Sequence, residues 1–192
     1  TFAGELEKLR KTFRAIREID FFDAPKAHVA ESQLDRLESA TRSKTPAAPR
    51  LQAAKFQGKI WVTRPRPEID RVACAWLIRS FIDPKATFKF AAQAEAIAGG
   101  IPFDYAHGEF SHHGEDCTFE TLLARFGIAD KALPKIGEMV HDADLEDEKF
   151  QRPEGVGLDR ILKGWAKRGM PDDEILIRGG NCFDGLYAFL RR

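Results

Sequence analysis

The sequence predicts an α/β fold that is predominantly helical, with a small sheet started by one β-α-β unit. Two short runs of β-branched and aromatic residues flank a helical stretch, and most of the chain after them repeats apolar residues at helical spacing. Apolar residues make up 43% of the 192 residues, which is enough for a core and excludes disorder throughout the chain.

Residues 1–41 are predicted to form a helical hairpin, because apolar residues recur at steps of three and four on both sides of a break near Pro25. Such a hairpin is too thin to bury a core by itself. Its apolar stripe is either a plain packing face or the seam of a homodimer, and the pattern leaves both open. Residues 42–56 are rich in Ala, Pro and basic residues without periodicity, which predicts a linker.

Residues 57–192 are predicted to form the main domain, in which helices flank the small sheet. Its β-α-β unit is a strand at 59–63, a helix from about 67 to 82 and a strand at 87–90, joined by a right-handed crossover. A short third strand is expected at 101–105. The helices expected after it cover residues 117–126, 134–143, 158–165 and 172–190.

Charge is balanced over the whole chain but not along it. The 30 Lys and Arg residues match 30 Asp and Glu residues, which argues against a protein that coats nucleic acid. Residues 51–91 carry eight basic and three acidic side chains, whereas residues 92–150 carry four basic and thirteen acidic ones with four of the five histidines. The first segment favours an anion and the second a metal cation.

Composition also bears on the cellular location. No apolar run reaches the roughly 18 residues of a membrane helix, and no signal-peptide pattern opens the chain. The three cysteines are far apart and form no C-x-x-C pair, so we expect no disulfides and a reducing compartment. We therefore expect a cytoplasmic protein without a membrane partner, and the start at Thr1 suggests a processed or shortened chain.

An oxyanion site is predicted at the turn between the first strand and the helix of the β-α-β unit. Free N–H groups and the positive end of the helix dipole favour anions at such a turn. The guanidinium groups of Arg64, Arg66 and Arg71 add donors whose planar geometry matches oxyanions. The alternative is that Arg71 pairs with Asp70 or Glu68 while the other arginines are solvated.

A single divalent-metal site is predicted from two segments about 30 residues apart. His112 would come from a glycine-punctuated loop, and His141 with Asp144 from the end of the 134–143 helix, where their spacing places them on one face. The weaker candidate ligands are Glu109, His113 and Asp142. Zinc, manganese and iron are not distinguished. Alternatively, His141 stabilises a helix end above a solvated loop, or Asp144 only orients His141.

Cys117 is the candidate catalytic residue. It lies at a predicted helix N-terminus, where the dipole lowers the pKa of a thiol, whereas Cys74 lies in an apolar helix. We therefore expect Cys117 to be the more reactive of the two.

Three segments resemble the chromate-resistance ChrB family, specifically its C-terminal domain: KIWVTRPRPEIDRVACAWLIRSFID, FDYAHGEFSHHGEDCTFETLL and VHDADLEDEKF. The resemblance covers about residues 57–192, and residues 1–41 resemble the end of the family's N-terminal region. It implies a regulator or accessory factor in chromate resistance, encoded near a chromate efflux pump, with transcription responding to chromate.

The leading hypothesis is a chromate-responsive sensor of a bacterial chromate-resistance system, which binds chromate or a similar oxyanion and one divalent metal. Contact with DNA would fall to the N-terminal region that the chain resembles only at its end. The alternative is a metal-dependent redox or hydrolytic enzyme acting in chromate or oxidative stress, with Cys117 as nucleophile or redox thiol. A third hypothesis is an interaction module that positions a partner through the N-terminal helices.

Overall fold

The computed structural model describes residues 8–13, 16, 50–105 and 108–191. The chain divides into two units, Thr1–Ala48 and Pro49–Arg192. In the first unit the described residues are helical. The rest of the predicted hairpin, with its packing face or dimer seam, and residues 42–49 of the predicted linker lie outside the described residues.

The second unit contains a three-stranded parallel sheet in the order β2-β1-β3. Its strands are β1 (Ile60–Thr63), β2 (Thr87–Phe90) and β3 (Ile101–Pro102). Trp61 of the central strand lies opposite Phe88 on one side and Ile101 on the other, and it is fully buried. The chain leaves β1 for β2 on one side and later for β3 on the other. The carboxyl end of β1 is therefore a topological switch point, where open α/β sheets bind ligands.

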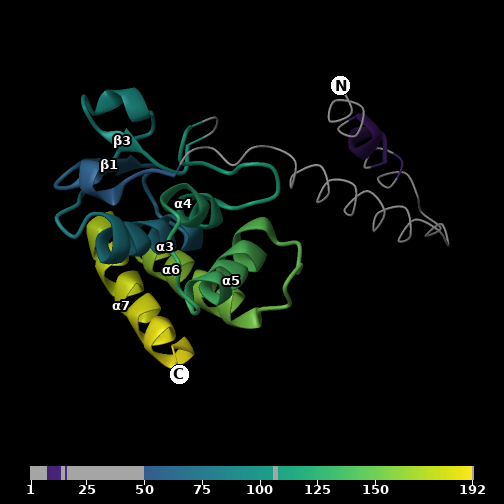
Figure 1. The fold of residues 1–192 in the computed structure, drawn as a ribbon. Coiled ribbons are helices and arrows are strands. Elements are labelled where there is room, and N and C mark those ends of the chain that lie inside the picture. Colours follow the sequence, from purple (N-terminus) through teal and green to yellow (C-terminus); the bar gives the residue numbers. More distant parts are fainter. Residues whose placement is uncertain (1–7, 14–15, 17–49, 106–107, 192) are drawn as a thin grey trace. The chain divides into compact units, whose positions relative to one another are not determined.

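The remaining elements are mainly helices, which lie beside and below the sheet in the view of Figure 1. They are α3 (Ile69–Leu77), α4 (Thr118–Phe126), α5 (Leu133–Leu145), α6 (Pro153–Lys167) and α7 (Asp172–Leu190), with a π-helical turn at Ile78–Ile82 and 3-10 turns at Ala53–Phe56 and Ala94–Ala96. Helix α3 is central, because it contacts each of the other four helices. All of its residues except Arg71 are buried.

A single hydrophobic core joins the sheet to the helices. Phe56 stacks on Trp61 with ring centroids 5.9 Å apart, so the end of the segment expected as a linker packs on this unit. Helix α6 approaches α5 closely at Gly155, where a Cβ would lie 1.8 Å from the carbonyl oxygen of Met139. Glycine at this position therefore lets α6 pack against the carboxyl half of α5.

The predicted fold class, helical with a small β-α-β sheet, is confirmed. Strand β2 and helix α7 have their predicted bounds. The helix expected from 67 begins at Ile69, because Glu68 has an extended backbone as its N-cap. The strand expected at 101–105 ends at Pro102; Asp104 has a φ of 56°, which takes the chain out of the β region.

The other predicted helices differ in their bounds. Helix α6 begins five residues earlier than expected, at Pro153, a residue type that suits the first turn.

Among the described residues, we find no helix with the length and apolarity needed to cross a bilayer.

Candidate functional site

The candidate site lies at the switch point, where residues that follow two parallel strands meet the starts and ends of helices. Arg64 follows β1 and Asp104 follows β3, so both lie at the carboxyl edge of the sheet. Asp70 lies in the first turn of α3 and Asp144 in the last turn of α5. The loop before α4 contributes His112. Four separate parts of the chain and one loop therefore supply the site.

Three carboxylates converge on one ring nitrogen of His112. Its Nε2 lies 3.2 Å from Asp70 Oδ2, 3.2 Å from Asp144 Oδ2 and 3.5 Å from Asp104 Oδ1. Hydrogen bonds with Asp144 and then Asp70 raise the pKa of His112 to about 10, against the opposing effect of burial. His112 is therefore an imidazolium at neutral pH in the metal-free protein. We call these four residues the His112 cluster.

Two of the three carboxylates of the His112 cluster are held in place by the start of α4. The two oxygens of Asp70 accept hydrogen bonds from the backbone N–H groups of Thr118 (2.9 Å) and Phe119 (3.0 Å), which have no partner within the helix. The hydroxyl of Thr118 donates to Asp104 Oδ1 at 3.0 Å. Asp70 and Asp104 are both buried, with exposed fractions of 1% and 7%. Their positions are thus fixed without any ligand.

The predicted oxyanion-binding arginines divide between two places. Arg64 donates to Asp104 Oδ2 at 2.8 Å, and Arg71 Nε lies 3.4 Å from the same oxygen. Arg66 instead donates to the carbonyl oxygen of Ala166 at 2.8 Å. The structure therefore brings Arg64 and Arg71 together but not Arg66. The carboxylate that pairs with Arg71 is Asp104, in place of the Asp70 or Glu68 that the alternative to an oxyanion site had named.

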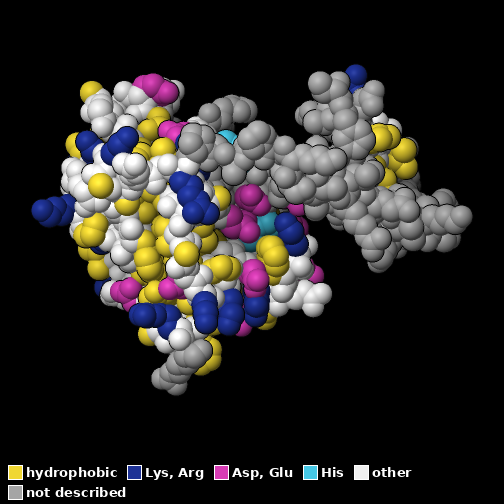
Figure 2. All heavy atoms as spheres, viewed as in Figure 1, with side chains coloured by type: hydrophobic (Ala, Val, Ile, Leu, Met, Phe, Trp, Pro, Cys, Tyr) yellow, Lys and Arg dark blue, Asp and Glu magenta, His cyan; other side chains and the backbone are white. Residues whose placement is uncertain are grey.

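The side chains around Asp104 are close to electrically neutral as a set. Two guanidinium groups and the His112 imidazolium face the three carboxylates of the His112 cluster. Figure 2 shows acidic side chains with histidine among them on the viewed face, beside Lys and Arg side chains. A divalent cation that replaced the imidazolium proton would leave an excess of positive charge at this site.

A second group of ionisable residues lies at the start of α4 and on α5. The ligand atoms of Cys117, Glu120 and His141 all lie within 4.8 Å of one another. His141 Nδ1 lies 2.7 Å from Glu120 Oε2, and its Nε2 lies 3.2 Å from Asp147 Oδ2. The His141 side chain is fully buried. We call Cys117, Glu120, His141 and Asp147 the His141 cluster.

The expectation that the helix dipole lowers the pKa of the Cys117 thiol is wrong, whereas the higher reactivity expected for Cys117 than for Cys74 stays a prediction. Cys117 is the N-cap of α4, as its position in the sequence predicts, but it is fully buried. Burial raises the pKa of its thiol, and the negative charges of Asp70 and Glu120 raise it further. Burial likewise raises the pKa of Cys74. Cys117 is therefore a neutral thiol in the metal-free protein, because desolvation outweighs the helix dipole.

The residues predicted as one metal site fall into two groups. His112 and Asp144 do come together, but His141 contacts Glu120 and Asp147 instead, and no metal-binding group among the described residues contains both histidines. The physical reason is that His141 faces the first turn of α4 from within the core.

The weaker candidates have other partners. Glu109 pairs with Arg125, and a ring nitrogen of the exposed His113 lies 3.2 Å from the carbonyl oxygen of Glu109. Asp142 accepts hydrogen bonds from the backbone N–H groups of Phe150 (2.8 Å) and Arg152 (2.7 Å). Asp142 therefore fixes the loop after α5.

Sequence reasoning missed Asp70, Asp104 and Glu120 as candidate ligands. A signal existed for Asp104, because it follows a strand parallel to β1 and so shares an edge with Arg64. Glu120 lies three residues after the N-cap, the spacing of a capping box. For Asp70 the only signal was a carboxylate in a mainly apolar helix.

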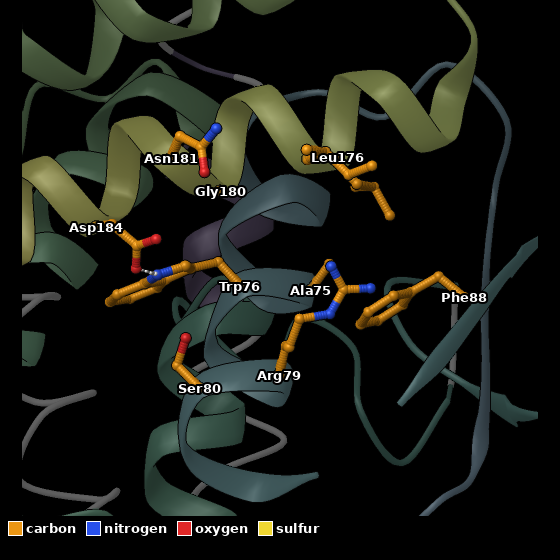
Figure 3. Close-up of a pocket in the computed structure, with 10 residues that line it drawn as sticks. Ala75, Trp76, Arg79, Ser80, Phe88, Leu176, Gly180, Asn181 and Asp184 are labelled. Atoms are coloured by element: carbon orange, nitrogen blue, oxygen red, sulfur yellow. Dashed lines mark hydrogen bonds between the residues drawn. The ribbon is translucent and has the colours of Figure 1, made fainter. Parts of the chain in front are cut away.

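A separate cavity of about 150 Å³ lies between α3 and α7 (Figure 3). Trp76 Nε1 donates to Asp184 at 2.8 Å at its edge, and Arg79 lies over the ring of Phe88. None of the residues that line it belongs to the His112 or His141 cluster. The cavity is therefore distinct from the candidate site.

Comparison with known proteins finds one matching family over most of the second unit. The model of the ChrB C-terminal domain matches residues 61–190. The chain is 37% identical over 185 residues to Protein ChrB of Cupriavidus metallidurans, an alignment that covers 91% of this chain and 56% of that protein. The chain thus spans about half the length of this curated relative. No solved structure matches it.

Proposed function

The chain belongs to the ChrB family, and on that premise we propose that it is the sensing part of a cytoplasmic, chromate-responsive transcription regulator in bacterial chromate resistance. Arg64 and Arg71 would bind chromate or a similar oxyanion. The His112 cluster would bind one divalent metal ion. Contact with DNA and formation of a homodimer remain predictions for the N-terminal region.

The observation that carries this proposal is the shared carboxylate of Asp104. Its Oδ2 contacts Arg64 and Arg71, while its Oδ1 lies 3.5 Å from His112 Nε2. Chromate offers arginine the same kind of charged acceptor oxygens as a carboxylate does. Chromate would therefore compete with Asp104 for Arg64, whose side chain is 50% exposed.

A bound metal ion would weaken the competition of Asp104 with chromate for the arginines. A divalent cation bound by the His112 cluster would attract Asp104 and neutralise part of its charge, which weakens its hold on the guanidinium groups. Oxygen-rich ligand sets with one imidazole suit manganese or iron. We therefore expect the metal-loaded protein to bind chromate more tightly than the metal-free protein.

Calorimetric titration with chromate, with sulfate as a redox-inert comparison, tests the proposal. Arg64→Ala should weaken binding by about tenfold, or about 1.4 kcal/mol, and added Mn²⁺ should strengthen binding to wild type but not to Asp144→Asn. Arg66→Ala is the matched control, since Arg66 contacts Ala166 instead. Equal binding by wild type and the Arg64→Ala, Arg71→Ala double variant would overturn the oxyanion site.

The alternative of a metal-dependent enzyme relied on Cys117 as nucleophile or redox thiol. This thiol is fully buried and its pKa is raised, so it does not present a thiolate to a substrate. We therefore favour the function of a sensor over that of a metal-dependent enzyme.

A further inference from the structure

We propose that Cys117, Glu120 and His141 bind a zinc ion that joins the start of α4 to α5. This site is separate from the His112 cluster and does not depend on the proposed oxyanion sensor. Its ligands would be the Glu120 carboxylate, the His141 imidazole and the Cys117 thiolate, which forms when the thiol releases its proton on metal binding; proteins use all three groups for zinc.

The positions of the ligand atoms fit a small metal ion. They lie within 4.8 Å of one another, and ligands of a tetrahedral zinc ion lie about 3.5 Å apart when the bonds are about 2.0–2.3 Å long. Small side-chain movements would therefore close the site. Glu120 also accepts a hydrogen bond from the N–H group of Cys117 at 3.0 Å, which holds these two ligands on one helical turn.

The second ring nitrogen of His141 has the partner that a metal-binding histidine requires. Nδ1 points to Glu120 at 2.7 Å, whereas Nε2 lies 3.2 Å from Asp147 Oδ2. A carboxylate that accepts the remaining N–H of a ligating imidazole fixes its tautomer and ring orientation. The edge of the His141 ring packs against Phe150, with centroids 5.0 Å apart, which further restricts the imidazole.

A cavity of about 480 Å³ beside α4 and α5 borders one member of the ligand set, Glu120. Glu120, Gly137, Glu138 and Phe150 are among the residues that line it. Glu120 is the partly exposed member of the ligand set, with 22% of its side chain accessible, while Cys117 and His141 are buried. The cavity could also supply a water molecule as fourth ligand.

Ligand chemistry separates the two clusters. The His112 cluster offers one imidazole and three carboxylates, a set that suits harder cations. The His141 cluster includes a thiol, which selects zinc over manganese. The two sites should therefore take different metals from a mixture.

Cobalt(II) is the probe, because it replaces zinc and gives a near-ultraviolet charge-transfer absorption when bound to a thiolate. We expect this band when metal-free protein is titrated with Co²⁺, and its loss when Zn²⁺ is added. Cys117→Ser should abolish the band while the hydroxyl retains the N-cap. Cys182→Ser, on α7, is the matched control and should keep the band.

Further variants keep the test decisive if Cys117→Ser does not fold. Glu120→Gln retains an acceptor for the capping box but removes the negative charge of this ligand. Asp147→Asn removes the charge beside His141 Nε2 and should weaken cobalt binding by about 10–100-fold. Asp144→Asn, in the His112 cluster, should leave the band intact. Absence of the band from wild type, or its persistence in Cys117→Ser, would overturn the zinc site.

Discussion

The His112 and His141 clusters each place a histidine among carboxylates at the first turn of α4, yet they differ in exposure and in chemistry. The His112 side chain is 40% exposed and is surrounded by carboxylates that also contact arginines. The His141 side chain is fully buried, with a thiol beside it. The same residue type therefore lies at an accessible position in one cluster and at a buried position in the other.

The largest expected difference between the buried and the accessible parts of the site is in the reaction rate of the thiols. Cys117 and Cys74 are buried, whereas Cys182 is partly exposed. A buried thiol reacts only when the fold opens, so alkylation of Cys117 should be at least about 10³-fold slower than that of Cys182. Mass spectrometry after timed alkylation measures the rates. Labelling of Cys117 as fast as Cys182 would show that the His141 cluster is open.

Removal of the buried histidine should have the next largest effect. His141→Ala leaves Glu120 and Asp147 without their shared partner and creates a cavity, so we expect the free energy of unfolding to fall by about 3 kcal/mol. Urea denaturation measures the change. His113→Ala is the control, because His113 is exposed and should alter stability by less than about 0.5 kcal/mol. Equal effects of the two substitutions would erase the distinction between buried and exposed histidines.

The smallest effect concerns the protonation of His112. Its pKa is about 10 in the folded, metal-free protein and about 6.5 in an unfolded chain. The imidazolium therefore stabilises the fold fully below about pH 6.5, and this contribution is lost as the pH rises toward about 10. The gain is modest because the ring is partly exposed.

Two measurements check this expectation. Nuclear magnetic resonance should show His112 still protonated at about pH 8, and the difference in stability between wild type and His112→Ala should shrink from neutral to alkaline pH. An ordinary titration of His112 near pH 6.5 would mean that the three carboxylates do not hold its proton.

Local patterns in the sequence were enough for much of the fold. Strand β2 and helix α7 have their predicted bounds, because alternation or helical periodicity ends there at clear breaks. The start of α4 directly after its N-cap, Cys117, was likewise predictable from the sequence around it. Such features depend on neighbours within a few residues.

The composition of the candidate site depends on distant contacts instead. The burial of Cys117 results from packing by α3 and α5 on α4, which no local pattern contains. Asp70 reaches the start of α4 across 48 positions, so its role as a partner of Thr118 had no local signal. The division of His112 from His141 follows from the same packing, because one faces solvent and the other the core.

The order of the sheet makes the candidate receptor a product of complete folding. Arg64 and Asp104 are 40 positions apart and meet only when β3 docks on β1. Closing a chain loop of that length costs about 3 kcal/mol in entropy, so the pair has no counterpart in partly folded molecules. A chain whose third strand has not docked therefore lacks the contact that joins Arg64 to the His112 cluster.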